Sequence, residues 1–497
     1  MVILLAAGLL IRAALYFPLA MFQIDSDGVL AGLCAFHIGP GHYPAFFPGG
    51  TRLSAASCYV ALMFFGLIGP GRVGLALTGL TWGALYLLFM LLFLRALFDA
   101  KRACLAFLFA AIPSEQFVTV TYVPWGYGEI MASCAATLWL AALWRKSGGL
   151  WQRLFFGLSV GLGLWISLQT IMVALPSFIW VAVNRRHTVA RECIPALLGV
   201  LAGSTPFLLG NLANGFASLT QNWASRPVSS IGQVGQNLAW LISSPLAKLL
   251  FHWYTGLDSI VLIAAYALVA IGFVDALRRR EPDSQPATDD DAVKLLLFVV
   301  TSCVLIFIFS QAGSARGWTV RYIAPLYLVV PLFLSIGVSS LSRRSHALAI
   351  AAAIALLLPS LLQYSLPGSV LRSRLTAELK NDSALRDVLA QRHIRFVYGD
   401  YFWVYHLSFD TREQILGIPT YAPVDYLNYA DVAALAPARW AMLGGQDEVL
   451  RWARAVGARG TIASDGDLSV FLADRRAERP GLLLERLRRI FQRGVSR

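Results

Sequence analysis

Long apolar runs separated by short polar segments fill the chain from its first residues to about residue 364. A helix needs about 20 such residues to cross the roughly 30 Å hydrocarbon core of a bilayer. The pattern predicts about 11 membrane spans, over residues 2–22, 72–97, 103–120, 129–144, 152–168, 169–184, 194–212, 256–276, 294–311, 322–341 and 345–363. The run 54–69 is shorter and predicts a helix beside the membrane. The Gly- and Pro-rich segment 23–53 predicts a polar loop.

The distribution of basic residues gives these spans an orientation. Loops on the cytoplasmic side of a membrane are enriched in lysine and arginine. If the N-terminus is cytoplasmic, every predicted cytoplasmic loop carries a basic pair or triplet: Lys101/Arg102, Arg145/Lys146, Arg185/Arg186, Arg278/Arg279/Arg280 and Arg343/Arg344. The same orientation places Asp25, Asp27 and Glu129 outside the cytoplasm, together with the C-terminal residues.

Composition supports a membrane protein and excludes a soluble one. Only 14% of the residues are charged, whereas soluble domains carry about 25%. The net charge of +13 would suggest nucleic-acid binding in a soluble protein. Because the basic residues cluster between apolar runs, we expect contact with anionic lipid and no nucleic-acid partner. The six cysteines have neither metal-like nor disulfide-like spacing, so we expect small buried side chains.

A change of composition near residue 366 predicts a separate domain. Residues 383–389 and 446–457 have helical patterns, and 394–398 and 439–443 have strand patterns. A hairpin is predicted with its turn at Ser464-Asp465-Gly466-Asp467. We therefore predict three parts: a transmembrane domain at 1–364, an extracytoplasmic α/β domain at 365–480 and a basic amphipathic tail at 481–497. The tail pattern is typical of a helix on a membrane surface.

Three carboxylates at the ends of predicted spans are the candidates for chemistry. Asp25 and Asp27 follow the first span, and Glu129 opens another after Gly126-Tyr127-Gly128. Two alternatives are structural: solvated loop positions for the aspartates, and an acid favoured by the helix dipole for Glu129. Convergence of acids from two separate loops on one membrane face favours a functional site.

A carboxylate beside an apolar wall can act as a general base. It takes a proton from an acceptor hydroxyl while a lipid phosphate leaves, and the phosphate then needs cationic partners. Candidates on the same predicted face are Arg52, Lys248, Arg316 and Arg321. For Arg321, directly before a predicted span, a snorkelling interfacial arginine is the alternative. His37 and His42 are candidates to bind phosphate or metal, although without paired ligand spacing an interface position is favoured.

Two stretches around the acids carry a family resemblance. Asp27-Gly28 precedes Gly32-Leu33-Cys34-Ala35-Phe36-His37-Ile38, and Gly41 and Pro44 follow. This pattern resembles the first-loop motif of GT-C-fold, polyprenyl-phosphate-sugar-dependent membrane glycosyltransferases, in the bacterial branch related to glycosyltransferase family 39, the protein mannosyltransferases. Gly28 stands where that motif usually has a glutamate, so either Asp25 substitutes or the acid pair is reduced to one. Tyr127-Gly128-Glu129 is similar to the family's second acidic site, and Arg321-Tyr322 also occurs in such sequences.

The resemblance implies inverting transfer of a sugar from a polyprenyl-phosphate donor to a hydroxyl of a lipid, glycan or protein. It implies catalytic roles for Asp27, Asp25 and Glu129, with substrate contacts from Arg321, Tyr322 and Tyr127. Arg52, Lys248 and His42 complete the predicted substrate-binding set. No metal or other cofactor is expected, and the site is expected to face outside the cytoplasm at a bacterial inner (plasma) membrane. A lipid or oligosaccharide transporter and a non-catalytic envelope-assembly protein are the alternatives. A transporter predicts internal repeats, and we find none in the sequence.

Overall fold

The structure is a computed structural model that divides into two compact units. It describes residues 2–22, 26–49, 53–122, 124, 126–220, 226–244, 246, 258–278, 288–314, 319–365, 385–420, 429, 431–432, 439–444, 446–465 and 468–474. The first unit comprises Met1–Phe17, Thr51–Ser57 and Gly79–Leu366. The second comprises Pro18–Gly50, Cys58–Thr78 and Pro367–Arg497. The second unit therefore joins the residues around the first predicted loop to the C-terminal residues.

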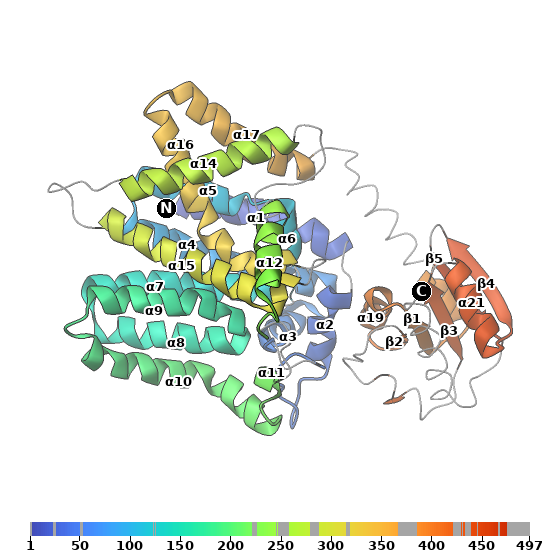
Figure 1. The fold of residues 1–497 in the computed structure, drawn as a ribbon. Helices are drawn as coiled ribbons and strands as arrows, with labels where there is room; N and C mark the ends of the chain where they lie inside the picture. The colour runs from blue at the N-terminus through green and yellow to red at the C-terminus, as the bar shows by residue number, and fades with distance from the viewer. Residues whose placement is uncertain are drawn as a thin grey trace. The chain divides into compact units, whose positions relative to one another are not determined.

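Every segment predicted to span the membrane lies on helical structure (Figure 1). The long helices are α1 Val2–Phe22, α4 Arg72–Leu97, α7 Tyr127–Ser147, α8 Leu150–Ile166, α9 Ile171–Asn184, α10 Val189–Ala213, α14 Asp258–Arg278, α15 Thr288–Phe309 and α17 His346–Ser365. Two predicted spans are broken, into α5 Ala100–Ala111 with α6 Glu115–Tyr122, and into η4 Thr319–Leu328 with α16 Val330–Ser342. Shorter elements are α2 Ser26–Phe36, α3 Ala56–Ile68, η1 Leu168–Thr170, α11 Ala217–Thr220, α12 Ile231–Ser243 and η3 Gln311–Ser314.

Only some of the described helices are long and apolar enough for a single helix to cross a membrane. Among the described residues, α4, α10 and the Ala292–Phe309 part of α15 each qualify, and the bent pair η4–α16 gives a fourth candidate. The predicted total of about 11 spans stays a prediction. Helix α3 has 13 residues and extends about 20 Å, less than the hydrocarbon core, so its length agrees with a helix beside the membrane.

Outward-facing leucines on α10 give this helix an apolar surface. Leu198, Leu201 and Leu209 are each more than half exposed. A contiguous apolar surface on a helix of this length is typical of a side that faces lipid. On the opposite side α10 packs on α8, and α7, α8, α9 and α10 lie side by side in Figure 1.

Helices α8 and α10 approach one another through paired glycines. An added Cβ at Gly157 or Gly161 of α8 would lie 1.8 or 2.3 Å from a backbone oxygen of α10. The reciprocal positions, Gly199 and Gly203 of α10, would meet α8 backbone at 2.1 and 2.4 Å. Both helices thus carry the Gly-x-x-x-Gly spacing that allows close packing of membrane helices.

At the break between α5 and α6, side chains from other helices donate hydrogen bonds to the free carbonyl groups of α5. Helix α5 ends at Ala111, before Pro113, and its last carbonyls lack intrahelical donors. Arg12 of α1 is fully buried and donates from Nη2 to the Ala110 carbonyl at 2.6 Å. The Tyr327 hydroxyl of η4 donates to the Phe109 carbonyl at 3.0 Å. These two side chains meet the requirement that backbone polar groups in a membrane have partners.

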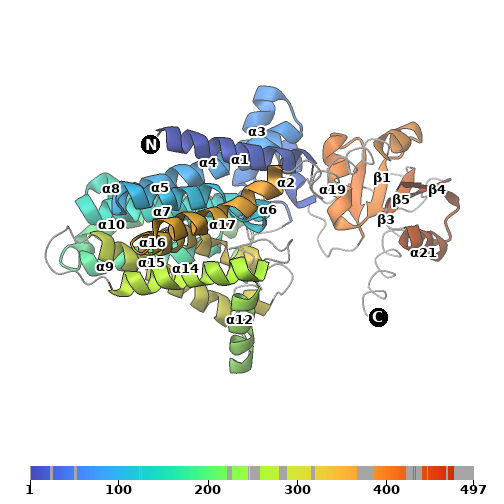
Figure 2. The ribbon, with the colours of Figure 1, turned by 90° about the horizontal axis from the view of Figure 1, so that it is seen from above.

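A second helical group packs beside the first-unit core. Helix α16 contacts α14, α17 and α5, and Figure 2 shows α14, α16 and α17 next to one another. The main core cluster contains large buried side chains from several helices, among them Phe93, Phe107, Trp144 and Trp180. This packed interior holds the N-terminal end of α7, where Glu129 lies.

The C-terminal part of the second unit is a mixed sheet with helices. The strands are β1 Phe396–Gly399, β2 Leu416–Pro419, β3 Trp440–Gly444, β4 Gly460–Asp465 and β5 Leu468–Ala473, in the order β2-β1-β3-β5-β4. Strand β1 is parallel to β2 and β3, whereas β5 is antiparallel to β3 and β4. Helix α19 Tyr401–Asp410 connects β1 to β2, and α21 Gln446–Val456 connects β3 to β4.

Several sequence predictions are confirmed by the described residues of the two units, and two are corrected. The strands near 394–398 and 439–443, the helix at 446–457 and the β4–β5 hairpin are present, and 385–391 is helical. The polar loop predicted over 23–53 is wrong in part, because it contains the mostly buried helix α2. Of the six cysteines predicted to be buried, Cys104 is exposed and Cys193 half-buried. The tail at 481–497 lies outside the described residues, and the three-part domain division stays a prediction.

Candidate functional site

Glu129 lies buried at the start of α7, with 1% of its surface exposed. The Ser57 hydroxyl donates a hydrogen bond to its Oε1 atom, and the Trp82 indole N–H donates to Ser57 at 3.0 Å. Within the described part of the chain, Oε2 has no hydrogen-bond partner. A buried carboxylate oxygen without a partner is costly for folding, which makes Glu129 a candidate functional residue.

Two glycines allow α7 to begin at this point. Gly126 precedes the helix with φ of 102°, in the left-handed region, and a Cβ there would lie 2.9 Å from Leu53. Gly128 approaches the Thr121 carbonyl and Trp82 so closely that a Cβ would lie 3.0 and 3.1 Å from them. The Gly-Tyr-Gly sequence therefore seats the first turn of α7 against α4 and α6, with Glu129 directed inward.

Arg321 and Tyr322 lie on η4, which packs against α6 and α7. The Arg321 guanidinium carbon lies 5.6 Å from the centre of the Tyr322 ring, within cation–π range. Tyr322 packs on the main core cluster, and Tyr127 is buried within it. Arg321, Tyr322, Tyr127 and Glu129 therefore all come from packed elements of the first unit.

Asp27 stands in the first turn of α2, in the second unit. The Tyr401 hydroxyl of α19 donates a hydrogen bond to Asp27 Oδ1 at 2.5 Å. The neighbouring Ser26 hydroxyl donates to the Tyr401 carbonyl and accepts from the Tyr405 backbone N–H at 3.3 Å. The helix that carries the predicted base is thus held by the C-terminal residues, 374 positions away in the sequence.

Aromatic contacts extend this packing along α2. The Phe36 and Phe409 rings stack with centroids 5.5 Å apart and planes 7° apart. Gly32 faces Phe409 so closely that a Cβ would lie 2.4 Å from the ring. Beyond the helix, His37 Nε2 pairs with Glu413 Oε1 at 2.7 Å.

The contact between His37 and Glu413 changes the pKa of both side chains. The hydrogen bond to Glu413 raises the pKa of His37 above its usual 6.5, because it outweighs the opposing effect of burial. Burial alone would raise the pKa of Glu413, but the hydrogen bonds from His37 and Tyr429 and the charges of His37 and Arg395 lower it below 4.5. The imidazolium and the carboxylate therefore stabilise one another, and His37 is occupied by a protein carboxylate.

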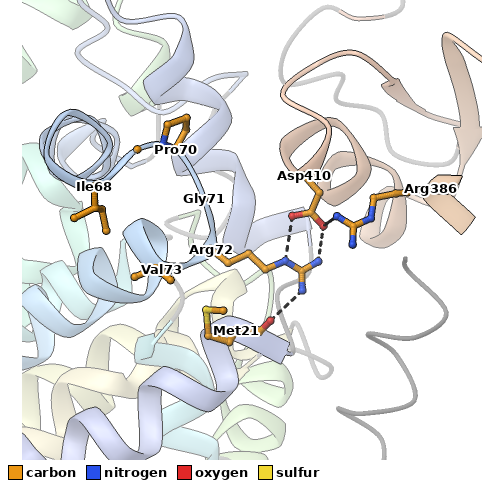
Figure 3. Close-up of a pocket in the computed structure, with 9 residues that line it drawn as sticks. Met21, Ile68, Pro70, Gly71, Arg72, Val73, Arg386 and Asp410 are labelled. Carbon is orange, nitrogen blue, oxygen red and sulfur yellow. Dashed lines mark hydrogen bonds and ion pairs between the residues drawn. The ribbon is translucent and has the colours of Figure 1, made fainter. Parts of the chain in front are cut away.

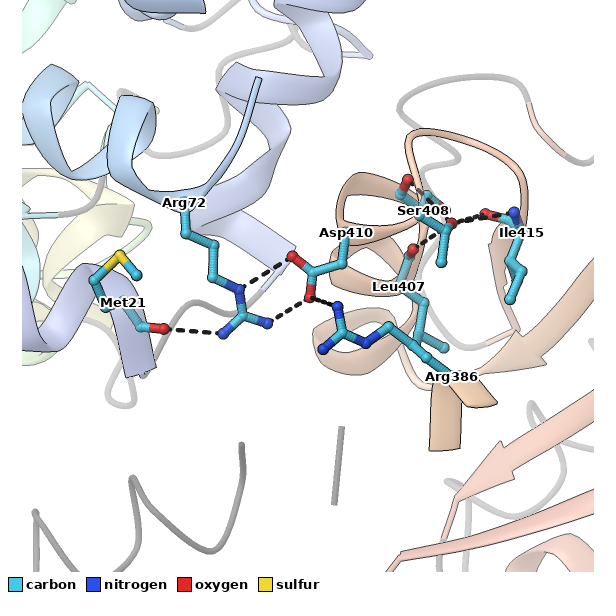
Figure 4. A network of polar contacts seen from close by, with 8 residues as sticks. Met21, Arg72, Arg386, Leu407, Ser408, Asp410 and Ile415 are labelled. Carbon is cyan, nitrogen blue, oxygen red and sulfur yellow. Dashed lines mark hydrogen bonds and ion pairs between the residues drawn. The ribbon is translucent and has the colours of Figure 1, made fainter. Parts of the chain in front are cut away.

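A cavity of about 440 Å³ opens beside an arginine pair in the same unit (Figure 3). Arg72 donates to Asp410 through Nε at 3.1 Å and Nη2 at 2.5 Å, and through Nη1 to the Met21 carbonyl at 3.0 Å (Figure 4). Arg386 approaches the same carboxylate at 3.6 Å. Asp410 is only 6% exposed, so its carboxylate is shielded from water.

The predicted site residues are not all described. Asp25, Arg52, Lys248 and Arg316 lie outside the described residues. His42 is exposed in a turn, where its backbone carbonyl accepts from Gly39 at 3.3 Å. Asp27 and Glu129 belong to different units, so their predicted convergence stays a prediction. Within the described residues no group of three His, Cys, Asp or Glu side chains could hold a metal ion. The expectation that no metal is needed remains untested.

The sequence did not predict three residues that hold the acids in place, two by direct contact and one through a neighbour. Ser57 and Trp82 contact or support Glu129, and Tyr401 contacts Asp27. Tyr401 opens helix α19 directly after strand β1, and nothing in the local sequence marks its hydroxyl as a partner of Asp27. Ser57 and Trp82 stand in apolar runs without a distinguishing pattern.

Comparison with known proteins identifies the fold. No family model matches the chain, and no curated protein matches its sequence. The crystal structure of ArnT from Cupriavidus metallidurans bound to undecaprenyl phosphate is similar, with a TM-score of 0.64 and 13% identity over 95% of this chain and 97% of that one. The apo state of the same protein gives a TM-score of 0.62 at 13% identity over the same shares of each chain. The chain has the GT-C fold, a multi-helix membrane fold with a small C-terminal region of mixed sheet and helix.

Proposed function

We propose that this protein is a membrane glycosyltransferase that moves a sugar from a polyprenyl-phosphate donor to a hydroxyl of a lipid, glycan or protein acceptor. The observation that carries the proposal is the GT-C fold, shared with ArnT over 95% of this chain. Fold similarity alone does not determine chemistry, so the proposal also needs suitable side chains. The buried Glu129 and the anchored Asp27 supply carboxylates for that chemistry.

In the proposed reaction Asp27 is the general base. The acceptor oxygen forms a bond to the anomeric carbon while the bond from that carbon to the donor phosphate oxygen breaks. Asp27 takes the proton of the acceptor hydroxyl, and the polyprenyl phosphate leaves with the electron pair. Attack from the side opposite the leaving group inverts the anomeric centre. Glu129 supplies the second acidic site. At the position where Gly28 replaces the usual glutamate, either Asp25 substitutes or Asp27 acts as the only acid of that pair.

The leaving phosphate needs positive charge that is already in position. Arg321 and Tyr322 are the described candidates, because η4 holds them against α7, which carries Glu129. The undecaprenyl phosphate in the ArnT structure supports a lipid phosphate of this class as the partner. Tyr127, His42, Arg52 and Lys248 remain candidates for further substrate contacts.

The proposed setting is a bacterial inner membrane, with the site facing outside the cytoplasm. This orientation rests on the basic cytoplasmic loops predicted from the sequence. The GT-C fold supports a transferase over a lipid transporter or a non-catalytic assembly protein.

A donor panel tests the proposal. Purified full-length protein in liposomes receives radiolabelled sugars on polyprenyl monophosphate, on polyprenyl diphosphate or on a nucleotide, together with extracted membrane acceptors. We expect label on an acceptor only from the monophosphate donor, with an equal amount of polyprenyl phosphate released. Movement of a fluorescent donor across the bilayer without any transfer would instead support a transporter.

A second experiment, with a control variant, tests the proposed contact between Arg321 and the donor phosphate. Arg321→Ala should weaken donor binding at least tenfold, because one charge-assisted contact to phosphate is lost. Arg343→Ala removes an arginine that is 57% exposed, at the end of α16, and should leave donor binding unchanged. Equal donor affinity in wild type and Arg321→Ala would remove Arg321 from the phosphate site.

A further inference from the structure

Within the second unit, helix α19 holds α2 at Asp27, the residue proposed as the base. Tyr401 donates its hydroxyl to Asp27, and Ser26 bridges to the backbone of Tyr401 and Tyr405. These three hydrogen bonds fix the first turn of α2 from both the side chain and the backbone. The Phe36–Phe409 stack fixes its other end.

Helix α19 is itself anchored to the sheet. The Ser408 hydroxyl accepts from the Gly417 backbone N–H at 2.7 Å, and a Cβ on Gly417 would lie 2.0 Å from the Val404 carbonyl. Strand β2, which contains Gly417, pairs in parallel with β1. A continuous set of hydrogen bonds and close contacts therefore runs from strands β1 and β2 through α19 to Asp27.

A general base acts only when its carboxylate is held within hydrogen-bond reach of the proton it takes. Small misplacements of reacting groups lower rates steeply, because effective concentration depends on orientation. An aspartate in the first turn of a short helix has free rotation about two side-chain bonds unless a partner fixes it. Tyr401 supplies that partner from helix α19, which packs on strand β2.

We propose that Tyr401 is a positioning residue for Asp27, and that the C-terminal α/β residues thereby take part in catalysis. This inference rests on the proposed function, since it gives Asp27 the role of base. Tyr401 orients one carboxylate oxygen through its hydroxyl. The ring of Tyr401, edge-on to Tyr405 with centroids 5.7 Å apart, holds the hydroxyl in place.

Tyr401→Phe tests the inference, because it keeps the ring and removes only the hydroxyl. We expect kcat to fall about tenfold to a hundredfold, as for loss of a hydrogen bond to a charged group, with the KM for donor within about twofold of wild type. Ser26→Ala, which removes the backbone bridges, should lower kcat in the same way. Tyr59→Phe is the matched control, because it also removes a tyrosine hydroxyl of the same unit, one that donates to the Pro44 carbonyl at 2.9 Å.

The possible outcomes separate the inference from the function on which it rests. A wild-type protein with no transfer overturns both. A wild-type protein that transfers sugar, with Tyr401→Phe equal to Tyr59→Phe in kcat, overturns the positioning role and leaves the transferase intact. If Tyr401→Phe lowers thermal stability as well as kcat, the kcat values of Tyr401→Phe and Ser26→Ala are measured at a lower temperature, at which both variants are folded. A full recovery of kcat there assigns Tyr401 a structural role and overturns the inference.

Discussion

The Ser57 hydroxyl donates a hydrogen bond to the buried carboxylate of Glu129, and the Trp82 indole in turn donates to Ser57. The contact joins α3's first turn to the start of α7 across 72 positions of sequence. One carboxylate oxygen is thus oriented by the protein. The other has no partner among the described residues and faces a buried environment.

We expect Glu129→Gln to lower transfer at least a hundredfold while leaving the folded yield unchanged. The amide keeps the shape of the side chain but is neutral and cannot act as an acid or a base. Transfer rate and size-exclusion profile in detergent measure the two effects. Retention of more than a tenth of wild-type transfer would contradict a catalytic role for Glu129.

Ser57→Ala should lower transfer about tenfold, because Glu129 then loses its donor and is no longer oriented. Ser159→Ala is the matched variant, since it also removes a buried hydroxyl, one that pairs with Thr137 at 2.8 Å in the same unit. The rate ratio of the two variants is the measurement. Equal rates would show that the Ser57 hydroxyl matters only for packing.

The Arg72–Asp410 pair should be important for stability of the second unit. Asp410→Ala removes the carboxylate and leaves two arginines beside a shielded site, which costs about 3 kcal/mol or more. Arg386→Ala keeps the two-bond Arg72–Asp410 contact and removes a partner that is 32% exposed, so it should cost less than about 1 kcal/mol. Thermal unfolding followed by tryptophan fluorescence would rank them. The reverse ranking would contradict the network.

Stability should depend on pH through His37 and Glu413. The pKa of His37 is raised, so its contribution is complete below the unfolded value of 6.5 and is lost as the pH rises through the folded value. The pKa of Glu413 is lowered, so its contribution is present above the unfolded value of 4.5 and is lost as the pH falls through the folded value. The pair therefore stabilises the folded state most between the two unfolded-state values, pH 4.5 and pH 6.5. The effect is small, because 46% of the His37 side chain is exposed.

The variant His37→Gln isolates this contribution. The difference in melting temperature between wild type and His37→Gln should be larger at pH 5.5 than at pH 8.5. A difference that is constant across this range would show that the ion pair adds no stability.

Close packing of α8 on α10 predicts that these glycines cannot be enlarged. Gly161→Ala places a Cβ 2.3 Å from the Val200 carbonyl and should force the helices apart, with a large loss of folded yield. Gly66→Ala in α3 is the control, because nothing lies within 4 Å of its added Cβ. Alanine there should be neutral or stabilise the helix by up to about 1 kcal/mol. Fluorescence-detected size-exclusion yields compare them, and equal yields would contradict the packing.

The sequence was sufficient for the helical elements because their signal is local. Runs of about 20 apolar residues predict helices wherever they occur, and the strands of the C-terminal sheet alternate or follow turn residues. The pattern failed at α2, whose 11 residues are too few for a span and lie between two polar stretches. That helix is buried because it packs on α19, which is far away in the sequence. The periodicity of the local sequence cannot predict a contact with such a distant helix.

Some residues of the candidate site could also be predicted from the sequence, and others could not. Asp27 and Glu129 could be selected because charge at the end of an apolar run is unusual and because both lie in recognisable motifs. Ser57, Trp82 and Tyr401 could not, because a serine, a tryptophan and a tyrosine are ordinary in such segments. Their roles depend on contacts between residues at least 25 positions apart. Only the folded chain brings those groups within hydrogen-bond distance.

The most direct test of the account is the transfer rate of Asp27→Asn, measured with the donor that the panel identifies. We expect at least a hundredfold loss in kcat with a normal melting temperature, since the amide keeps the hydrogen bond from Tyr401 but cannot take the acceptor proton. Asp99→Asn is the control, because Asp99 caps α5 and asparagine caps helices equally well. Transfer by Asp27→Asn within a few-fold of Asp99→Asn would contradict the assignment of Asp27 as the base.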